Sequence, residues 1–312
     1  MNNYLITIDS SCDCSLQELN QKNIPVIFFK YNDETKTYKD NMQESGYKNF
    51  YTQMKEGKVF KTSQINPEEY YQFFEPLLDK NIPIIHISLG SGVSNTINSA
   101  NLTISQLKEK YPKSNIRVID TKLASLGSVL IMNKLIEFNF LDYSVDKAMN
   151  EIMPYVETLN AYYTTNTLTY FARGGRLSKI EAFFGNALKI NPILDCDPDG
   201  KLRVIEKARG SKKAIERLIA RIKDSSLDVS NQTLLVCHAD NEQIATSVGE
   251  RLVQEVGFKD YKLYFMGPII GAHTGPGLIA CFFFGKKRKD VITSLTENKE
   301  ELEKQLEKNT LE

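Results

Sequence analysis

The sequence lacks several residues and patterns on which common functions depend. It has no tryptophan and only three histidines, and its five cysteines are scattered through 312 residues. No Cys-x-x-Cys or His-x-x-x-His spacing occurs, so we expect no metal site. Dispersed cysteines in an odd number are typical of reduced thiols in a cytoplasmic protein rather than of a disulfide framework.

Long apolar runs and net charge are absent as well. The longest apolar stretches, such as 278–284, are far shorter than the roughly 20 residues that span a bilayer. The start of the chain lacks the basic and apolar regions of a signal peptide, which again predicts a cytoplasmic protein. Lys plus Arg and Asp plus Glu both number 39, so the formal net charge is zero. This balance argues against nucleic acid as a partner, because nucleic acid requires a basic surface.

Complete nucleotide-binding fingerprints are missing too. Gly90 and Gly92 follow an expected strand, but position 95 is Asn, so the full Gly-x-Gly-x-x-Gly pattern is not formed. No P-loop ending in Gly-Lys-Ser/Thr is present. A nucleotide site is therefore not supported, and we expect no cofactor.

The chain length predicts two domains, and the first half alternates short apolar runs with helical patterns. We expect strands at 4–8, 25–30, 83–89 and 116–119. Helices are expected at 68–80, opened by Asn66, Pro67 and Glu69, and from near Ser94 onward. This alternation predicts an N-terminal α/β domain at 1–160, with a mainly parallel sheet and helices on both faces. Ligands of such sheets bind beyond the carboxyl ends of the strands.

The second half has a different pattern, which predicts a C-terminal α+β domain at 161–289. A helix at 145–159 leads into it. Further strands are expected at 161–165, 190–194, 202–208, 233–237, 261–265 and 278–284, and helices at 178–188 and 242–256. The Asp-Pro-Asp-Gly stretch at 197–200 is a strong turn signal between two of these strands. The Glu- and Lys-rich tail at 290–312 is expected to form an exposed helix.

Hydroxyl side chains occur at two points of the first half where an anion can bind. Thr62 and Ser63 precede the capped helix on an expected loop, where two hydroxyls can donate to an anion. Ser94 lies where a buried strand gives way to a helix, whose free N–H groups favour an anion. The alternatives are a polar turn for the first pair and ordinary helix capping for Ser94.

Two segments of the second half are also candidates for a site. His273 lies in the glycine-rich segment 267–277, which we expect to form a tight loop, and this setting favours a functional histidine over a structural one. Arg173-Gly174-Gly175-Arg176 can bind a phosphate or an acidic partner. The alternative for Arg173 and Arg176 is an exposed turn at the entry to a helix.

Together these segments resemble the DegV family. The motifs, in the family's order, are Asp9-Ser10-Ser11, Thr62-Ser63-Gln64, Ser91-Gly92-x-Ser94, Arg173-Gly174-Gly175-Arg176, Asn191-Pro192-Ile193-Leu194, Gly200-Lys201-Leu202, Lys212-Lys213-Ala214 and Gly271-x-His273-x-Gly275-Pro276-Gly277. The resemblance covers residues 3 to 286, and each motif is short, so their ordered set is what makes it specific. Cys12, Cys14 and Asn191 depart from the residues common in the family.

The resemblance implies a non-enzymatic carrier that holds one long-chain fatty acid, such as palmitate, between its two domains. Thr62 and Ser94 would then hydrogen-bond the carboxylate, and Ser63 and His273 would form a second layer around it. No residue would be catalytic, and the fatty acid would be a bound ligand rather than a cofactor.

Some members of the family are implied to serve a bacterial fatty acid kinase in phospholipid metabolism. The kinase catalytic subunit phosphorylates the carboxylate while the carrier holds it. Arg173 and Arg176 would dock this partner or steady the acyl phosphate. A transient contact with the membrane surface is compatible with such a carrier.

Two other functions stay open at this point. A serine hydrolase acting on acyl esters would use Ser94 as nucleophile, His273 as base and Asp120 or Asp9 as the orienting acid. Residues 92–96 read Gly-Val-Ser-Asn-Thr, however, and lack the Gly-x-Ser-x-Gly elbow. The third function is a lipid-responsive sensor or scaffold.

Overall fold

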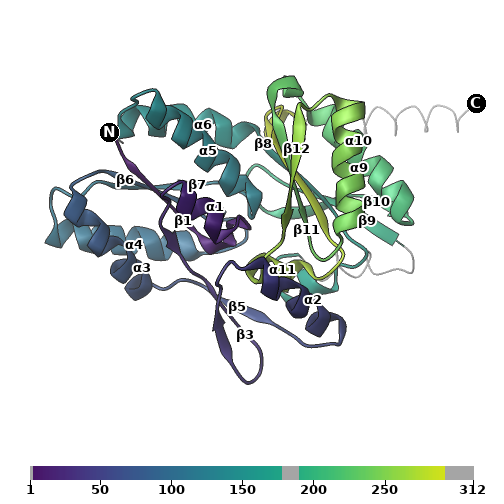
Figure 1. Cartoon of the computed structure of the whole chain (residues 1–312), viewed down its shortest axis with the longest axis horizontal. Coiled ribbons are helices and arrows are strands. Elements are labelled where there is room, and N and C mark those ends of the chain that lie inside the picture. The colour runs from purple at the N-terminus through teal and green to yellow at the C-terminus, as the bar shows by residue number, and fades with distance from the viewer. Residues whose placement is uncertain (1–2, 178–189, 292–312) are drawn as a thin grey trace, which may run out of the picture.

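The computed structural model describes residues 3–177 and 190–291. Two parts lie side by side in Figure 1, one holding the purple to teal first half of the chain and the other the green to yellow second half. The helix expected at 178–188 and residues 292–312 of the expected charged tail lie outside the described residues.

The first half is built on a four-stranded sheet in which all neighbouring strands are parallel. Its order is β2 (Val26–Ile27), β1 (Leu5–Asp9), β6 (Ile84–Ser88) and β7 (Ile116–Asp120). The predicted parallel sheet is confirmed. The strand expected at 25–30 is shorter, because the chain leaves this sheet after Ile27 and enters another one at Lys30.

Helices cover both faces of the parallel sheet, as predicted. The first-half helices are α1 (Leu16–Gln21), α2 (Tyr47–Lys55), α3 (Pro67–Phe74), α4 (Thr96–Lys110), α5 (Leu126–Phe140) and α6 (Val145–Thr158). Successive side chains of a strand point to opposite faces. Ile85 and Ile87 accordingly share a core with α5, while Ile84 shares another with α3 and α4.

The start of α3 follows the predicted capping box. The Asn66 side chain accepts the N–H of Glu69, and the Glu69 side chain accepts the N–H of Asn66, each at 2.9 Å. The expected helix at 68–80 is α-helical only to Phe74 and continues as a 3-10 helix. Pro76 explains the change, because it lacks the N–H that would continue the α-helical bonding.

A third sheet was not expected from the sequence. It is antiparallel, with the order β4 (Thr37–Lys39), β3 (Lys30–Asn32) and β5 (Lys61–Ser63), and it projects downward in Figure 1. Tyr31 holds it to the body, since its ring stacks on Tyr38 at 5.1 Å and meets Phe50 of α2 edge-on at 5.7 Å.

The second half is built on a six-stranded mixed sheet. Its order is β10 (Leu202–Arg209), β9 (Ile190–Cys196), β8 (Leu159–Thr164), β13 (Ile279–Phe284), β11 (Thr233–His238) and β12 (Asp260–Phe265). Only β11 and β12 pair in parallel, so the expected mixture of hairpins and helices is found. The described helices of this half are α7 (Thr169–Arg173), α9 (Ser211–Ser225), α10 (Glu242–Val256) and α11 (Pro268–Thr274).

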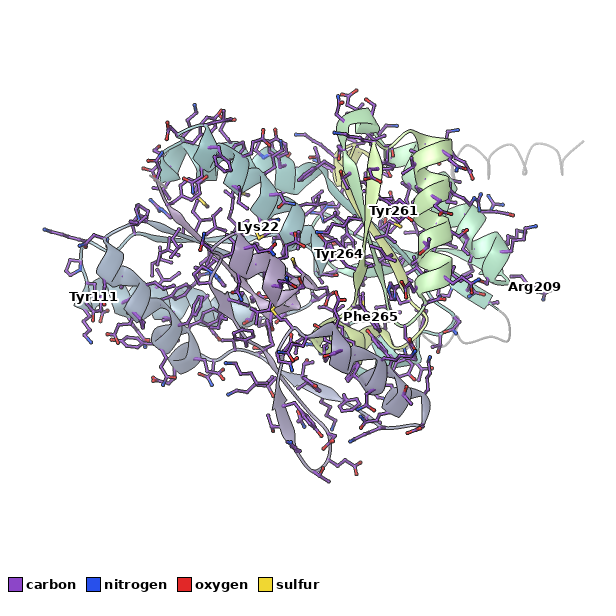
Figure 2. The ribbon with its side chains drawn as sticks, viewed as in Figure 1. Lys22, Tyr111, Arg209, Tyr261, Tyr264 and Phe265 are labelled. Carbon is purple, nitrogen blue, oxygen red and sulfur yellow. The ribbon has the colours of Figure 1, made fainter. Side chains whose placement is uncertain are left out.

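The two halves share one hydrophobic core. On β13, Ile279 and Cys281 face α9 and α10, whereas Ala280 and Phe282 belong to a cluster that includes β1, β6 and α5 of the first half. A polar link supports this contact at its edge. Glu18 of α1 bonds Lys22 at 3.0 Å and Lys262 of β12 at 2.6 Å. Figure 2 labels Lys22, which is part of this link, and Tyr264, whose hydroxyl lies 3.4 Å from the Glu18 carboxylate.

Within residues 3–177 and 190–291, no helix is both long and apolar enough to cross a membrane.

Candidate functional site

A cavity lies between the carboxyl edge of the parallel sheet and the second sheet. The space between the atoms that line it is about 770 Å³, a volume that includes open solvent at the mouth. Most of the lining is apolar: Phe29, Leu89, Val93, Ala124, Tyr163, Phe171, Cys196, Leu202, Met266, Ile269, Ile270 and Leu278. The polar lining residues are Thr62, Ser63, Gln64, Ser94, Ser125, Arg176, His273 and Thr274.

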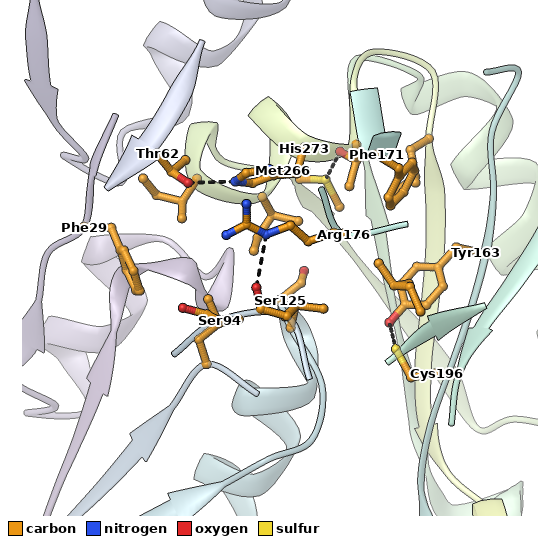
Figure 3. Close-up of a pocket in the computed structure, with 18 of the residues that line it drawn as sticks. Phe29, Thr62, Ser94, Ser125, Tyr163, Phe171, Arg176, Cys196, Met266 and His273 are labelled. Carbon is orange, nitrogen blue, oxygen red and sulfur yellow. Dashed lines mark hydrogen bonds between the residues drawn. The ribbon is translucent and has the colours of Figure 1, made fainter. Parts of the chain in front are cut away.

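Figure 3 shows how the polar and apolar parts are distributed. Thr62, His273 and Arg176 lie close to one another, while Tyr163 and Cys196 lie apart from them on strands of the second sheet. The Tyr163 hydroxyl is 3.7 Å from the Cys196 sulfur. The cavity therefore has a polar mouth and an apolar interior.

The segment after β1 positions the walls of this cavity. The Asp9 carboxylate accepts the N–H of Leu89 at 2.7 Å, and the Ser10 hydroxyl accepts the N–H of Phe29 at 3.0 Å. Leu89 and Phe29 both line the cavity. The Asp9-Ser10-Ser11 motif thus contributes to the cavity by positioning Leu89 and Phe29. Burial raises the pKa of Asp9 to about 6.

Asp13 makes the matching connection to the second half. Its carboxylate accepts the N–H of Gly267 at 2.8 Å, at the start of α11. Burial raises the pKa of Asp13 to about 8. The second carboxylate oxygen has no hydrogen-bond partner among the described residues. Such a group is costly when charged, so the neutral acid is favoured at neutral pH.

Thr62 and His273 meet at the mouth of the cavity. The expected loop around Thr62 is a strand, β5, in which Thr62 pairs with Tyr31. The expected loop around His273 is a short helix, because Pro268 opens α11 and Gly275, with φ 74°, ends it. Thr62 Oγ1 lies 2.7 Å from His273 Nε2.

The protonation state of the His273 ring follows from its surroundings. Burial, with a smaller effect of the Arg176 charge, lowers the pKa of His273 to about 4, so the ring is neutral at neutral pH. Nδ1 is buried and has no hydrogen-bond partner among the described residues. We assign the proton to Nε2, which then donates to Thr62 Oγ1 and leaves the Thr62 hydroxyl free to donate to a ligand.

The two arginines of the Arg-Gly-Gly-Arg motif have different positions. Arg176 lines the cavity and donates to Val93 O at 3.1 Å and to Gly174 O at 2.5 Å. In the described ranges it has no ion pair. Arg173 is exposed at the end of α7, with its guanidinium 5.5 Å from the Tyr170 ring centre, and is not part of the lining.

Ser63 and Ser94 both line the cavity. Ser63 follows Thr62 on β5 and is exposed. Ser94 is only 7% exposed, and its hydroxyl accepts the N–H of Thr96 at 3.3 Å. Helix α4 begins at Thr96 with Asn95 as N-cap, two residues later than expected, so Ser94 precedes the helix and faces the cavity.

The structure does not assemble a hydrolase triad. Among the described residues, no hydrogen bond joins Ser94 to His273, and none joins His273 to Asp9 or Asp120. Asp120 instead accepts the N–H groups of Ser91 and Lys122, each at 3.0 Å. In the same described part of the chain, no group of three or more His, Cys, Asp or Glu residues is placed to hold a metal ion.

Glycines allow close packing around the site. Within the second half, a Cβ on Gly174 would lie 2.3 Å from His273 Nδ1. Between the halves, a Cβ on Gly92 would lie 2.1 Å from the Gly200 carbonyl. The buried Arg288 donates to Lys122 O and to Val156 O, each at 3.3 Å. The Gly92 and Lys122 contacts join the loops after β6 and β7 to the second half.

Comparison with known proteins agrees with this architecture. Residues 3–286 match the model of the DegV family, a family described as uncharacterised proteins. The chain belongs to the DegV family. A DegV domain-containing protein from Clostridium perfringens is 29% identical over 290 residues, which cover 93% of this chain and 100% of the relative.

Solved DegV structures share the fold. DegV from Bacillus subtilis, a fatty acid binding protein, is 27% identical with a TM-score of 0.78, over 91% of this chain and 100% of that one. The Streptococcus pneumoniae fatty acid kinase (Fak) B3 protein, loaded with linoleic acid, has a TM-score of 0.78 over 91% of this chain and 99% of that one. At 19% identity, the similarity to the Fak B3 protein shows a shared fold and nothing more.

Sequence reasoning missed much of the lining of this DegV cavity. Tyr163, Cys196 and Phe171 come from β8, β9 and α7, and no motif marks them. Ser125 is also part of the lining and has φ 61° and ψ −135°. A strained serine of this kind has no sequence signal, because the strain appears only in the folded backbone.

Proposed function

We propose that this DegV protein binds one long-chain fatty acid in the cavity, with the carboxylate at the mouth. The observation that carries the proposal is an apolar interior beside the Thr62–His273 contact and beside Arg176, which has no ion pair within residues 3–177 and 190–291. Thr62 and Ser94 donate to the carboxylate, and Ser63 and His273 support them. The fatty acid binding of the Bacillus subtilis relative supports the same ligand.

The energetics agree with a carrier. Burying about a dozen methylenes at ~0.8 kcal/mol each gives on the order of 10 kcal/mol before the costs of association. The acyl chain therefore supplies most of the affinity. Hydroxyl donors and one guanidinium orient the head group at the mouth, where a second protein can reach it.

The test is the lipid content of the purified protein. Denaturing extraction followed by mass spectrometry should release about one fatty acid per chain, and delipidated protein should take up added palmitate. Protein that is empty and also fails to bind any fatty acid from C14 to C20 in calorimetry would contradict the proposal.

We also propose that the carrier works in the cytoplasm with the catalytic subunit of a fatty acid kinase, which converts the bound carboxylate to an acyl phosphate. The shared fold with the Fak B3 protein supports this partner. Arg173 is exposed and outside the lining, so it is suited to docking, while Arg176 is suited to steadying the head group. A transient membrane contact would allow lipid exchange.

Single-turnover phosphorylation with kinase and ATP tests this second proposal. Arg173→Ala should lower the rate while leaving palmitate affinity unchanged, and the exposed Arg209→Ala serves as its control. A loss of palmitate affinity in Arg173→Ala equal to the loss of rate would instead make Arg173 a structural residue.

A further inference from the structure

Three hydroxyl groups of the cavity lining have no oxygen or nitrogen partner in the described part of the chain. The Tyr163 hydroxyl is 3.7 Å from Cys196 Sγ, and the Thr274 hydroxyl donates to Met266 Sδ at 3.2 Å. Sulfur is only a weak acceptor. The third hydroxyl, that of Ser125, has no partner at all there. All three side chains are at most 7% exposed, so water at the surface does not satisfy them.

Ser125 is the least satisfied of the three and has an unusual backbone. It is 1% exposed and precedes α5 with φ 61° and ψ −135°, a conformation that costs free energy for a residue with a Cβ. Such strain is found mainly where it positions a functional group. In the view of Figure 3, Ser125 lies between Ser94 and Tyr163. The backbone therefore holds a free hydroxyl against the space that the acyl chain is proposed to fill.

A second unpaired oxygen lies beside Ser125. One carboxylate oxygen of Asp13 accepts the Gly267 N–H, and the other has no partner within residues 3–177 and 190–291. Burial raises the pKa of Asp13 to about 8, and the strongest opposing effect is that of the Ser125 hydroxyl. The two groups are therefore neighbours, although Ser125 is not placed to bond Asp13. Of the two, only Ser125 belongs to the cavity lining.

A plain alkyl chain cannot bond these groups. A buried hydroxyl without a partner is costly, whereas two hydroxyls that meet in a dry cavity replace the bonds that each loses to water. A hydroxyl is both a donor and an acceptor, as is Ser125. The ligand group that complements Ser125 is therefore a hydroxyl on the chain itself.

We propose that Ser125 recognises a hydroxyl group carried within the acyl chain, so that the cavity accepts hydroxylated long-chain fatty acids as well as plain ones. The chain hydroxyl forms a hydrogen bond with Ser125 Oγ, and Asp13 provides a polar neighbour behind it. The inference rests on the proposed function, because a buried acyl chain has to bring the hydroxyl to Ser125.

The test is isothermal titration calorimetry on the delipidated full chain. Stearate is compared with stearates that carry one hydroxyl at successive carbons from C2 to C12. Ser125→Ala removes the hydroxyl and keeps the Cβ. Ser125→Gly also removes it, and glycine adopts this backbone conformation without strain, so this variant guards against a loss of folding. Ser128→Ala is the matched control, because Ser128 is buried on α5 but is not part of the lining.

We expect at least one hydroxystearate isomer to bind the wild type within about threefold of stearate, although a hydroxyl in a wholly apolar cavity would weaken binding far more. Both Ser125 variants should weaken binding of that isomer roughly threefold to tenfold, as for one neutral hydrogen bond. Their stearate affinity should change less than about twofold, because stearate makes no bond there. Ser128→Ala should change neither affinity.

Two results would overturn the inference. Equal changes for stearate and hydroxystearate in the Ser125 variants would mean that Ser125 serves the carboxylate or solvent. A wild type that binds stearate but every hydroxylated isomer far more weakly would mean that the cavity rejects the group. Wild-type protein that binds neither kind of acid would instead contradict the proposed function.

Discussion

Gly92 packs against Gly200, backbone to backbone, where the loop after β6 meets the hairpin between β9 and β10. A Cβ added to Gly92 would lie 2.1 Å from the Gly200 carbonyl, a distance that real Cβ atoms do not adopt. Leu202, two residues after Gly200, lines the cavity. This contact therefore sets the distance between the two halves beside the mouth.

Gly92→Ala should weaken both folding and ligand retention. The added methyl has to push the hairpin away, and overpacking of this kind costs about 1–3 kcal/mol. Urea denaturation should show this loss, and mass spectrometry should find less lipid in the purified variant. Gly46→Ala is the control, because nothing lies within 4 Å of a Cβ at that position. Equal stability of the two variants would contradict the close contact.

Thr62→Val should lower fatty acid affinity without abolishing binding. The valine keeps the shape and the strand propensity of β5 but removes the hydroxyl that faces both His273 and the proposed carboxylate. Loss of one hydrogen bond to a charged acceptor costs about 1.5–3 kcal/mol. Calorimetry with palmitate measures the loss, and the exposed Thr52→Val on α2 is the control. Unchanged affinity would place the carboxylate elsewhere.

His273 should reduce the stability of the protein as the pH falls. Its folded pKa of about 4 lies below the ordinary value of 6.5, so the unfolded chain takes up the proton first. The contribution is fully present above pH 6.5 and is lost toward pH 4. Against His273→Gln, the free energy of unfolding of the wild type should fall by roughly 2–3 kcal/mol between pH 7 and pH 4. A pH-independent difference would contradict the buried neutral ring.

Asp13 should have the opposite effect, with stability falling as the pH rises. Its folded pKa of about 8 exceeds the ordinary 3.8, so the unfolded state loses its proton first. Asp13→Asn keeps an oxygen for the Gly267 N–H and removes the titration. Between pH 5 and pH 8, the free energy of unfolding of the variant should rise relative to that of the wild type by roughly 2–4 kcal/mol, as measured by urea denaturation. A constant difference across this range would mean that Asp13 stays charged.

The strands of the parallel sheet could be predicted because they carry their signal locally. β6 is buried at every position, and α3 has both partners of its capping box within four residues. Helix α5 was not predicted, because its sequence lacks such a local signal. It is buried on most sides, so its apolar residues do not form the one-sided pattern by which a helix is recognised.

The site could be predicted only in part, because its residues come together from distant positions. Thr62 and His273 are 211 residues apart, and nothing near Thr62 indicates a three-residue edge strand. Arg173 and Arg176 look equivalent in the motif, yet α7 ends at Arg173, so only Arg176 turns into the cavity. The direction of a side chain after a helix end depends on the folded backbone.

The shared core around α5 has a consequence for what counts as a folding unit. Ala280 and Phe282 of β13 are buried against residues of the first half. If the two halves were produced as separate fragments, each would therefore expose a large apolar surface to solvent. We therefore expect a single cooperative melting transition. The two halves are separate in topology, but we expect them to unfold as one thermodynamic unit.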